Sequence, residues 1–209
     1  FFVRLRYNNI NTAEWWDSAD YMTGAKEIAG LDLETYNLNP RRPFFLSVLW
    51  GFLIWLGGND YILHLSVTLL SLLGIYFVYL LGKDMFNYKA GLIAASLYSV
   101  LWINLFYTAR LMNDIPSLTF WIISAYFFSK WFFKEEKDYK SAVLAGIFFG
   151  LGLFTRAATL IYIIPLFLTI FIKQKFSFLK DKKVWAAALA VFIAFSPFLI
   201  WLFVTFDNP

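Results

Sequence analysis

Six long apolar segments constrain the fold of this chain more than any other feature. A helix that crosses a bilayer needs about 20 mostly apolar residues, because its backbone polar groups must be satisfied within the segment. The chain has 209 residues and is 60% hydrophobic, which excludes a disordered chain and argues against a soluble domain. We predict an all-α fold, a polytopic transmembrane helical bundle. The predicted spans are Tyr61–Leu81, Ala90–Tyr107, Ile115–Phe133, Ser141–Phe154, Ala157–Ile172 and Val184–Phe206.

The predicted organisation is a single transmembrane domain over 1–209. A first external loop occupies 1–60 and carries two short helices, and about six transmembrane helices occupy 61–206. We expect the sequence to be part of a longer chain, with one more span before Phe1. The fourth and fifth spans are separated only by "TRAAT", where we predict a turn at Arg156. The alternative is one long helix with an embedded arginine, which is costly at the centre of a bilayer.

The lysines predict the orientation. If successive spans alternate in direction, the loops 82–89, 134–140 and 173–183 share one side of the membrane. Eleven of the 18 basic residues lie on this side, counted from Lys130 at a helix end, and all eleven are lysines. The positive-inside rule makes this the cytoplasmic face. The isolated charges outside these loops, which are Asp60, Arg110, Asp114, Arg156 and Asp207, then fall at the external ends of spans, on the same face as the charged segment 14–42.

The external loop contains two amphipathic or apolar elements. Between Ser18 and Ala29 the apolar residues recur at helical spacing, which predicts a helix that lies in the membrane interface and ends at Gly30. A second short helix is predicted from Pro43 to the Gly57-Gly58 pair. It is too short to cross the membrane and is expected to be external or re-entrant.

Three carboxylates are candidates for chemistry on this face. Asp17 opens the interfacial helix, so it can simply cap the helix, and Asp20 would complete a capping box. Asp114 in "NDIPS" precedes a helix and can likewise be a helix cap or a functional carboxylate. Because the topology brings Asp17 and Asp114 to one face, the pair can instead deprotonate and orient a hydroxyl nucleophile. Holding a divalent cation through carboxylate oxygens is a further use for the same two residues.

The arginines are candidates for an anion site. Arg42 in "NPRRPFF" stands just before a helix N-terminus, where backbone N–H groups already favour an anion, and a guanidinium fork suits a phosphate. The alternative is contact with lipid headgroups. Arg156 lies at the external end of two apolar helices, and ionisable residues within membrane segments are functional candidates. Arg110 shares this face. With one histidine, His64, and no cysteine, a zinc site of nitrogen and sulfur ligands is not expected.

The order of these features resembles the GT-C superfamily of integral-membrane glycosyltransferases. The resemblance is closest to the group of dolichyl-phosphate-mannose–protein mannosyltransferases and lipid A aminoarabinose transferases. The motifs that carry it are "WWDSADYMTGAKEIA", "NPRRPFFLSVLWGFLIWLGG", "YLLGKDMF", "ARLMNDIPSLTFW" and "GLGLFTRAATLIYIIPL". They cover nearly the whole chain in the order of the family. The chain departs from the pattern at three positions: Ser18 replaces a second acid, Arg42 a lysine, and Phe44 a proline.

The resemblance implies a membrane glycosyltransferase that moves a sugar from a polyprenyl-phosphate donor to a hydroxyl acceptor on a protein, lipid or glycan. Transfer would proceed with inversion on the external face of a prokaryotic cell membrane. Asp17 is the implied base and Asp114 its partner, while Arg42 and Arg156 would bind the donor phosphate. Contacts to the sugar or acceptor are assigned to Asp20, Tyr21 and Arg110. No nucleic acid partner is expected, and a divalent cation is the only cofactor considered.

Two other classes of protein compete with this interpretation. A transporter or flippase for a lipid-linked substrate would more typically place charges at the membrane midplane on interrupted helices. A non-catalytic scaffold would use Asp17 and Asp114 as helix caps and the arginines as headgroup ligands. Asparagine caps a helix nearly as well as aspartate, so a scaffold should tolerate Asp-to-Asn replacement at both positions, whereas an enzyme should lose turnover.

Overall fold

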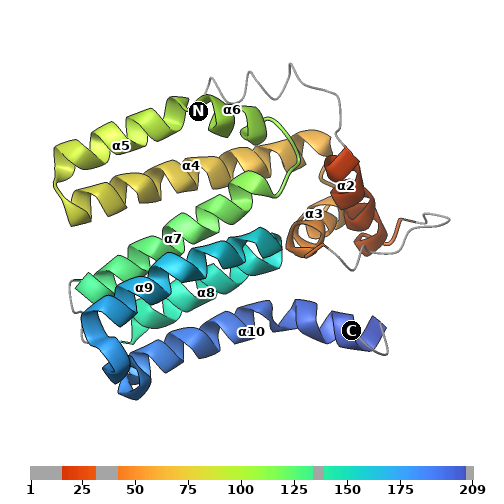
Figure 1. Ribbon diagram of the computed structural model, residues 1–209. Helices are drawn as coiled ribbons and strands as arrows, with labels where there is room; N and C mark the ends of the chain where they lie inside the picture. The colour runs from red at the N-terminus through yellow and green to blue at the C-terminus, as the bar shows by residue number, and fades with distance from the viewer. Residues whose placement is uncertain (1–15, 32–41, 134–138, 206–209) are drawn as a thin grey trace.

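A computed structural model of the protein describes residues 16–31, 42–133 and 139–205. The described residues form α-helices and two 3-10 segments, and no strand occurs among them, which confirms the predicted all-α class (Figure 1). The elements are α2 (Trp16–Ile28), α3 (Phe45–Trp55), α4 (Asp60–Met85), α5 (Tyr88–Val100), α6 (Trp102–Thr108), α7 (Asp114–Phe133), α8 (Lys140–Thr155), η1 (Ala157–Tyr162), α9 (Ile163–Gln174), η2 (Lys175–Lys180) and α10 (Lys182–Thr205).

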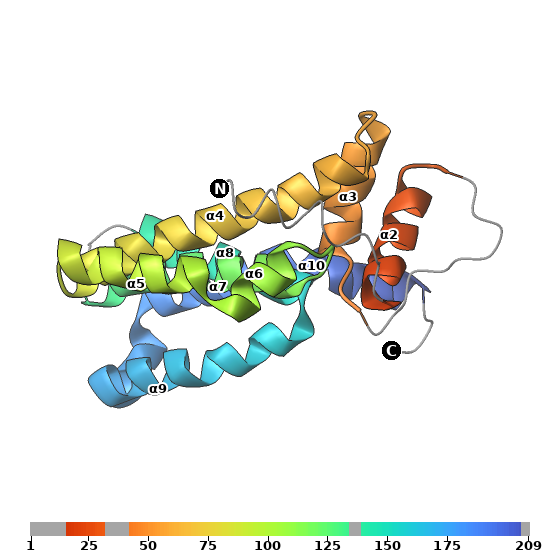
Figure 2. The ribbon, with the colours of Figure 1, turned by 90° about the horizontal axis from the view of Figure 1, so that it is seen from above.

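The long helices pack as a row of roughly antiparallel neighbours. Helix α4 packs against α5 and α7, α7 packs against α8, and α8 packs against α10 (Figure 1). Helices α2 and α3 pack against each other at one end of this row. Helix α9 stands apart from the row, as the view from above shows (Figure 2), and no residue of α9 is buried.

Within the described part of the chain, three stretches are long and apolar enough to cross a membrane. They are α4, the run from Ala157 to Lys180, and α10. A fourth span results if α5 and α6 are counted together, although the chain bends there by 57°. The second predicted span, Ala90–Tyr107, is therefore a broken helix. The chain turns at Arg156, which has an extended backbone between α8 and η1, as the two-helix interpretation predicted.

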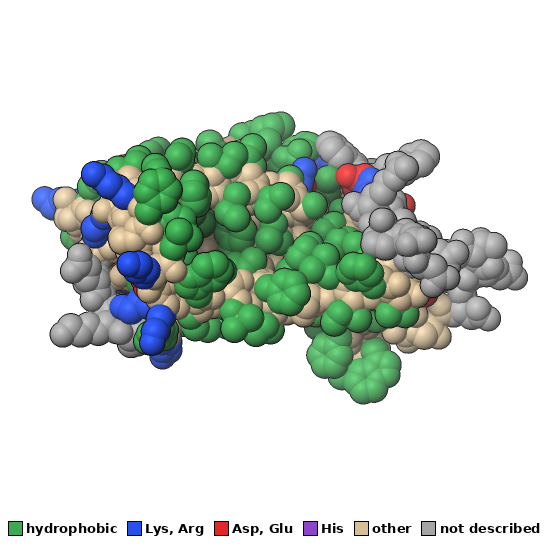
Figure 3. Space-filling view, turned by 60° about the horizontal axis from the view of Figure 1, so that its bottom comes forward, with side chains coloured by type: hydrophobic (Ala, Val, Ile, Leu, Met, Phe, Trp, Pro, Cys, Tyr) green, Lys and Arg blue, Asp and Glu red, His purple; other side chains and the backbone are tan. Residues whose placement is uncertain are grey.

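The lysines gather at one end of the bundle, as the space-filling view shows (Figure 3). This end is formed by the last turns of α4, α7 and α9 and the first turns of α5, α8 and α10. We call it the lysine-rich end, and its described lysines are Lys83, Lys89, Lys130, Lys140, Lys173, Lys175, Lys180, Lys182 and Lys183. Lys134 and Lys137 lie outside the described residues. Helices α2 and α3 lie at the opposite end.

Helices α2 and α3 are held together by a small apolar core. Met22 and Ala25 of α2 pack with Leu46 and Trp50 of α3, all of them buried. Glycines end both helices, because Gly30 (φ 78°) and Gly57 (φ 87°) adopt the left-handed conformation that other residues rarely take. Helix α3 begins at Phe45, two residues after Pro43, so the proline precedes the first turn rather than forming it.

Close contact between α8 and α10 depends on Gly146. A Cβ added at this position would lie 2.2 Å from the carbonyl oxygen of Ala187 and 2.9 Å from the Cβ of Ala190. Small residues allow membrane helices to approach each other in this way. We therefore expect Gly146→Ala to lower the free energy of unfolding by about 1–3 kcal/mol, the usual cost of overpacking. Thermal unfolding in detergent would measure the loss.

Gly152→Ala is the matched control on the same helix. Its added Cβ would meet only the Thr159 methyl at 3.0 Å, with the nearest backbone atom 3.6 Å away. We expect a smaller loss for this variant. Equal melting temperatures for Gly146→Ala and the wild type would show that α8 and α10 do not pack this closely.

Candidate functional site

The first of two ion-paired clusters at the opposite end joins α2 to the residues that precede α3. Arg42 Nη2 donates to Asp17 Oδ1 at 2.7 Å, and its Nη1 lies 3.5 Å from Asp20 Oδ2. Asp17 and Asp20 are three residues apart on α2 and therefore lie on one face of the helix. The Asp17 carboxylate lies within the first turn of α2 and is directed to Arg42. One guanidinium thus faces two carboxylates.

Tyr21 lies beside this cluster. Its ring centroid is 5.7 Å from the Arg42 guanidinium carbon. Burial raises the pKa of the Tyr21 hydroxyl above its usual value, against the opposing positive charges of Arg42 and, more weakly, Arg156. The hydroxyl is therefore protonated at neutral pH and available as a hydrogen-bond donor.

The pKa of the Arg42 guanidinium is also displaced. Burial acts to lower it, but the hydrogen bond with Asp17 and the negative charges nearby outweigh burial, and the pKa is raised. Arg42 therefore keeps its charge, and that charge is matched by Asp17 and Asp20. The sequence predicted Arg42 as a phosphate ligand, whereas the structure brings it together with the predicted base.

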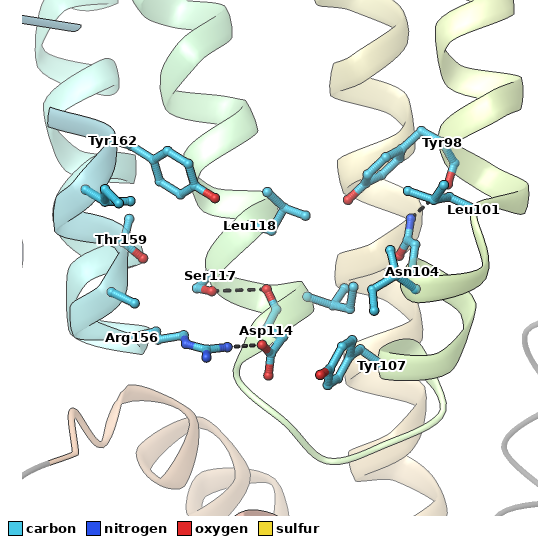
Figure 4. A pocket seen from close by; sticks show the side chains of 14 residues that line it. Tyr98, Leu101, Asn104, Tyr107, Asp114, Ser117, Leu118, Arg156, Thr159 and Tyr162 are labelled. Atoms are coloured by element: carbon cyan, nitrogen blue, oxygen red, sulfur yellow. Dashed lines mark hydrogen bonds and ion pairs between the residues drawn. The ribbon is translucent and has the colours of Figure 1, made fainter. Parts of the chain in front are cut away.

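The second cluster is the ion pair between Arg156 Nη1 and Asp114 Oδ1 (Figure 4). Asp114 is the first residue of α7, and Arg156 is the residue that follows α8. A buried hydrogen bond holds these two helix ends together, since Asn113 Nδ2 donates to the carbonyl oxygen of Thr155 at 2.8 Å. The Arg156 side chain is 45% exposed, so the guanidinium can contact a ligand while it remains paired.

Asp114 and Arg156 line a cavity of about 360 Å³ between α6, α7 and η1 (Figure 4). This volume falls within the range of small-molecule sites. The lining combines polar groups with aliphatic side chains, so one ligand could place a charged group at Arg156 and an apolar group deeper in the bundle. The lining residues are Tyr98, Leu101, Ile103, Asn104, Tyr107, Asp114, Ile115, Ser117, Leu118, Arg156, Ala158, Thr159, Ile161 and Tyr162.

The bend between α5 and α6 forms one wall of the cavity, and Asn104 stabilises it. Asn104 is 1% exposed, and its Nδ2 donates to the carbonyl oxygen of Tyr98, which precedes the break. Its Oδ1 accepts from the hydroxyl of Ser71 on α4 at 3.2 Å. Non-helical backbone at membrane depth needs partners of this kind. These hydrogen bonds of Asn104 therefore stabilise the break between α5 and α6.

We expect Asn104→Ala to destabilise the protein by about 1–3 kcal/mol, because the Tyr98 carbonyl and the Ser71 hydroxyl lose a buried partner. A lower melting temperature in detergent would show the effect. Ser99→Ala is the control, since its hydroxyl donates to the carbonyl oxygen of Ser96, three residues earlier in the same helix. Equal melting temperatures for the two variants would contradict the assigned role of Asn104.

The structure separates the predicted site residues into groups. The first cluster consists of Asp17, Asp20, Tyr21 and Arg42. The second is the pair Asp114 and Arg156, which lies in the wall of the cavity. Arg110 lies just after α6 and contacts that helix: its Nη1 donates to the carbonyl oxygen of Phe106, and its guanidinium carbon lies 3.6 Å from that residue's ring centroid. His64 is half-buried on α4. Among the described residues no group of three or more histidines, cysteines or acids could hold a metal ion, so a cation bound by Asp17 and Asp114 stays a prediction.

Several cavity residues were not identified from the sequence. Asn104, Tyr107, Thr159 and Tyr162 belong to segments that we treated only as apolar spans. Asn113 carries the clearest missed signal, because it stands beside Asp114 in the same "NDIPS" motif. Its amide joins the chain segments that hold the ion pair. Because asparagine carries no charge, the charge pattern of the sequence indicates only its neighbour Asp114.

The apolar helical bundle, with an ion-paired and partly apolar cavity at one end, defines the chain as a helical membrane protein with a candidate site at that end. The family described as dolichyl-phosphate-mannose-protein mannosyltransferase matches residues 40–201, and the chain belongs to it. It is thus a membrane glycosyltransferase of the GT-C type. No curated protein and no solved structure matches the chain. The matched range includes Arg42, Asp114 and Arg156 but begins after Asp17.

Proposed function

We propose that the protein transfers a sugar from a polyprenyl-phosphate donor to a hydroxyl acceptor, with inversion, on the external face of a prokaryotic cell membrane. The observation that carries the proposal is the cavity in which Arg156 and Asp114 face aliphatic side chains. A polyprenyl-phosphate sugar likewise combines a charged group with an apolar chain. Its phosphate suits Arg156, and the first isoprene units suit the apolar wall.

The proposed reaction breaks the bond between the anomeric carbon and the phosphate oxygen. The acceptor oxygen attacks the anomeric carbon from the opposite face, and polyprenyl phosphate leaves with the bonding electrons. The leaving group needs no proton, but it gains negative charge, which Arg156 stabilises in the transition state. The acceptor hydroxyl loses its proton to a carboxylate.

Asp17 is the proposed base, and Asp114 orients the acceptor while it stays paired with Arg156. Arg42 takes a different role from the one predicted from the sequence. Because its guanidinium already faces Asp17 and Asp20, it has little net positive charge to offer a phosphate. We assign it to the orientation of Asp17, with Tyr21 as a neutral hydrogen-bond donor beside them. Arg156 is then the principal phosphate ligand.

The test is a transfer assay on the full-length protein in detergent. A short-chain polyprenyl-phosphate sugar is supplied with and without a candidate hydroxyl acceptor, and free polyprenyl phosphate is measured. We expect release that depends on the acceptor and a product of inverted anomeric configuration, which NMR identifies. Donor binding without any release, over a panel of protein, lipid and glycan acceptors, would argue against transfer.

The broken helix favours one alternative function, that of a transporter for a lipid-linked substrate. Interrupted helices that line a cavity are typical of transporters. The α5–α6 pair, however, contributes no charged residue to the cavity lining, since its polar lining residues are Tyr98, Asn104 and Tyr107, and the charged pair lies at the end of the bundle. In reconstituted vesicles, a transporter would move the donor across the bilayer without breaking the sugar–phosphate bond, and an enzyme would break it.

A further inference from the structure

A second cavity lies between α9 and the row of helices, remote from the proposed reaction. It has a volume of about 380 Å³ and is lined by residues of α7, α8, η1, α9 and α10. Ser124 contributes the only side-chain hydroxyl to its lining, and that hydroxyl donates to the carbonyl oxygen of Ala145 at 2.8 Å. Apart from Ser124 and the indole of Trp131, the lining side chains are aliphatic or Phe, and each buried water needs several polar partners, so water is not expected to fill the cavity. The occupant must be apolar where it lies between the helices.

The size of this cavity distinguishes between apolar occupants. An α-helix is about 10 Å across with a pitch of about 5.4 Å, so the space holds about one turn of helix. A second copy of the chain or a partner helix would therefore fill it poorly. A single flexible hydrocarbon chain suits a cavity of this volume with an apolar lining from α9 and its neighbours.

The lysine-rich end of the cavity is strongly basic. Ile170 and Val184 line the cavity, Lys173 follows the first by three residues, and Lys183 immediately precedes the second. Lys173 Nζ bonds to the carbonyl oxygen of Phe132 at 3.0 Å and lies over that ring, which holds its ammonium group near this end. Residues 173–183 contain five lysines and one acid.

The single acid in this stretch, Asp181, stabilises the turn that leads into α10. Asp181 Oδ2 accepts from Gln174 Nε2 at 3.1 Å, and its Oδ1 accepts from the backbone N–H of Lys183 at 2.9 Å. Lys175, Lys180 and Lys182 are exposed. Phe176 is also exposed and lies between them, which is typical of a segment at the membrane interface.

We propose that this cavity binds one anionic phospholipid of the leaflet at the lysine-rich end. One acyl chain lies between α9 and the α8–α10 pair, and the phosphate lies among the lysines of 173–183. An ammonium near the headgroup contributes about 1 kcal/mol to binding of an anionic lipid, which corresponds to about a fivefold change in affinity. The phospholipid would also complete the packing of α9, which buries none of its own residues.

The test is native mass spectrometry of the full-length, delipidated protein with phosphatidylglycerol or phosphatidylcholine added. We expect wild type to bind phosphatidylglycerol at least about fivefold more tightly. Lys173→Gln combined with Lys183→Gln should reduce this preference to about twofold or less. The matched control is Lys83→Gln with Lys89→Gln, which removes two lysines from the same end but from the α4–α5 turn, and should keep the preference.

A second variant tests the acyl-chain site. Ala188 lines the cavity from an exposed position on α10, so Ala188→Phe should occupy the space with little effect on melting temperature and abolish binding of both lipids. Undiminished lipid binding by Ala188→Phe would place the lipids elsewhere. A preference that survives the Lys173/Lys183 replacement would overturn the headgroup assignment. Dimers in place of lipid adducts would identify a second copy as the occupant.

Discussion

Arg156→Gln is expected to lower the rate of sugar transfer about 100-fold to 1,000-fold, the usual loss when a group that stabilises transition-state charge is removed. The physical reason is the position of Arg156 in the cavity wall, beside Asp114 and facing the space assigned to the donor phosphate. The replacement also leaves Asp114 without its cation, so the phosphate would meet an unpaired negative charge. Donor affinity should therefore fall together with the maximal rate.

The measurement is a comparison of kcat and KM for the donor in the transfer assay. Arg156→Lys should retain part of the activity, because it keeps the charge but loses the planar fork that binds phosphate through two bonds. Lys26→Gln is the control, since it removes an exposed cation from α2 at the same end of the protein. Near-wild-type kinetics for Arg156→Gln would remove this residue from the mechanism and leave the pair as a structural link between α7 and α8.

Much of the fold could be predicted because the bilayer restricts what an apolar segment can do. The length of each segment and the lysines between them predict the order of helices and the two ends of the bundle. The break at Leu101 could not be predicted in this way. Neither proline nor glycine marks it, and the bend depends on Asn104, whose partners lie on α4 and at the end of α5. Such a pairing across helices leaves no local pattern.

The candidate site shows the same division between local and long-range information. Charge in an apolar context identified Asp17, Arg42, Asp114 and Arg156 as residues of one face. Which acid pairs with which arginine depends on how α2 packs against α3 and on how the ends of α7 and α8 meet. Arg42 illustrates the consequence: its place before α3 suggested an anion site, whereas the folded chain matches its charge with two carboxylates of α2.

Asp17→Asn is expected to reduce kcat about 100-fold to 10,000-fold, the usual range for loss of a general base. Donor binding should be unchanged, because Asp17 does not line the cavity that we assign to the donor. Asparagine keeps a side-chain oxygen that can accept the hydrogen bond from Arg42, so the local structure should persist. The variant therefore separates proton transfer from folding and from donor recognition.

Glu27→Gln is the matched control, because it neutralises an exposed carboxylate near the end of the same helix. A scaffold would tolerate both replacements equally. If turnover survives Asp17→Asn but is lost in Asp114→Asn, the base is the acid in the cavity, and Asp17 serves to hold Arg42. That result would agree with the family match, which begins at residue 40 and includes Asp114. Loss of turnover in Asp17→Asn alone would instead place proton transfer on α2, so that the packing of α2 against α3 becomes a condition for catalysis.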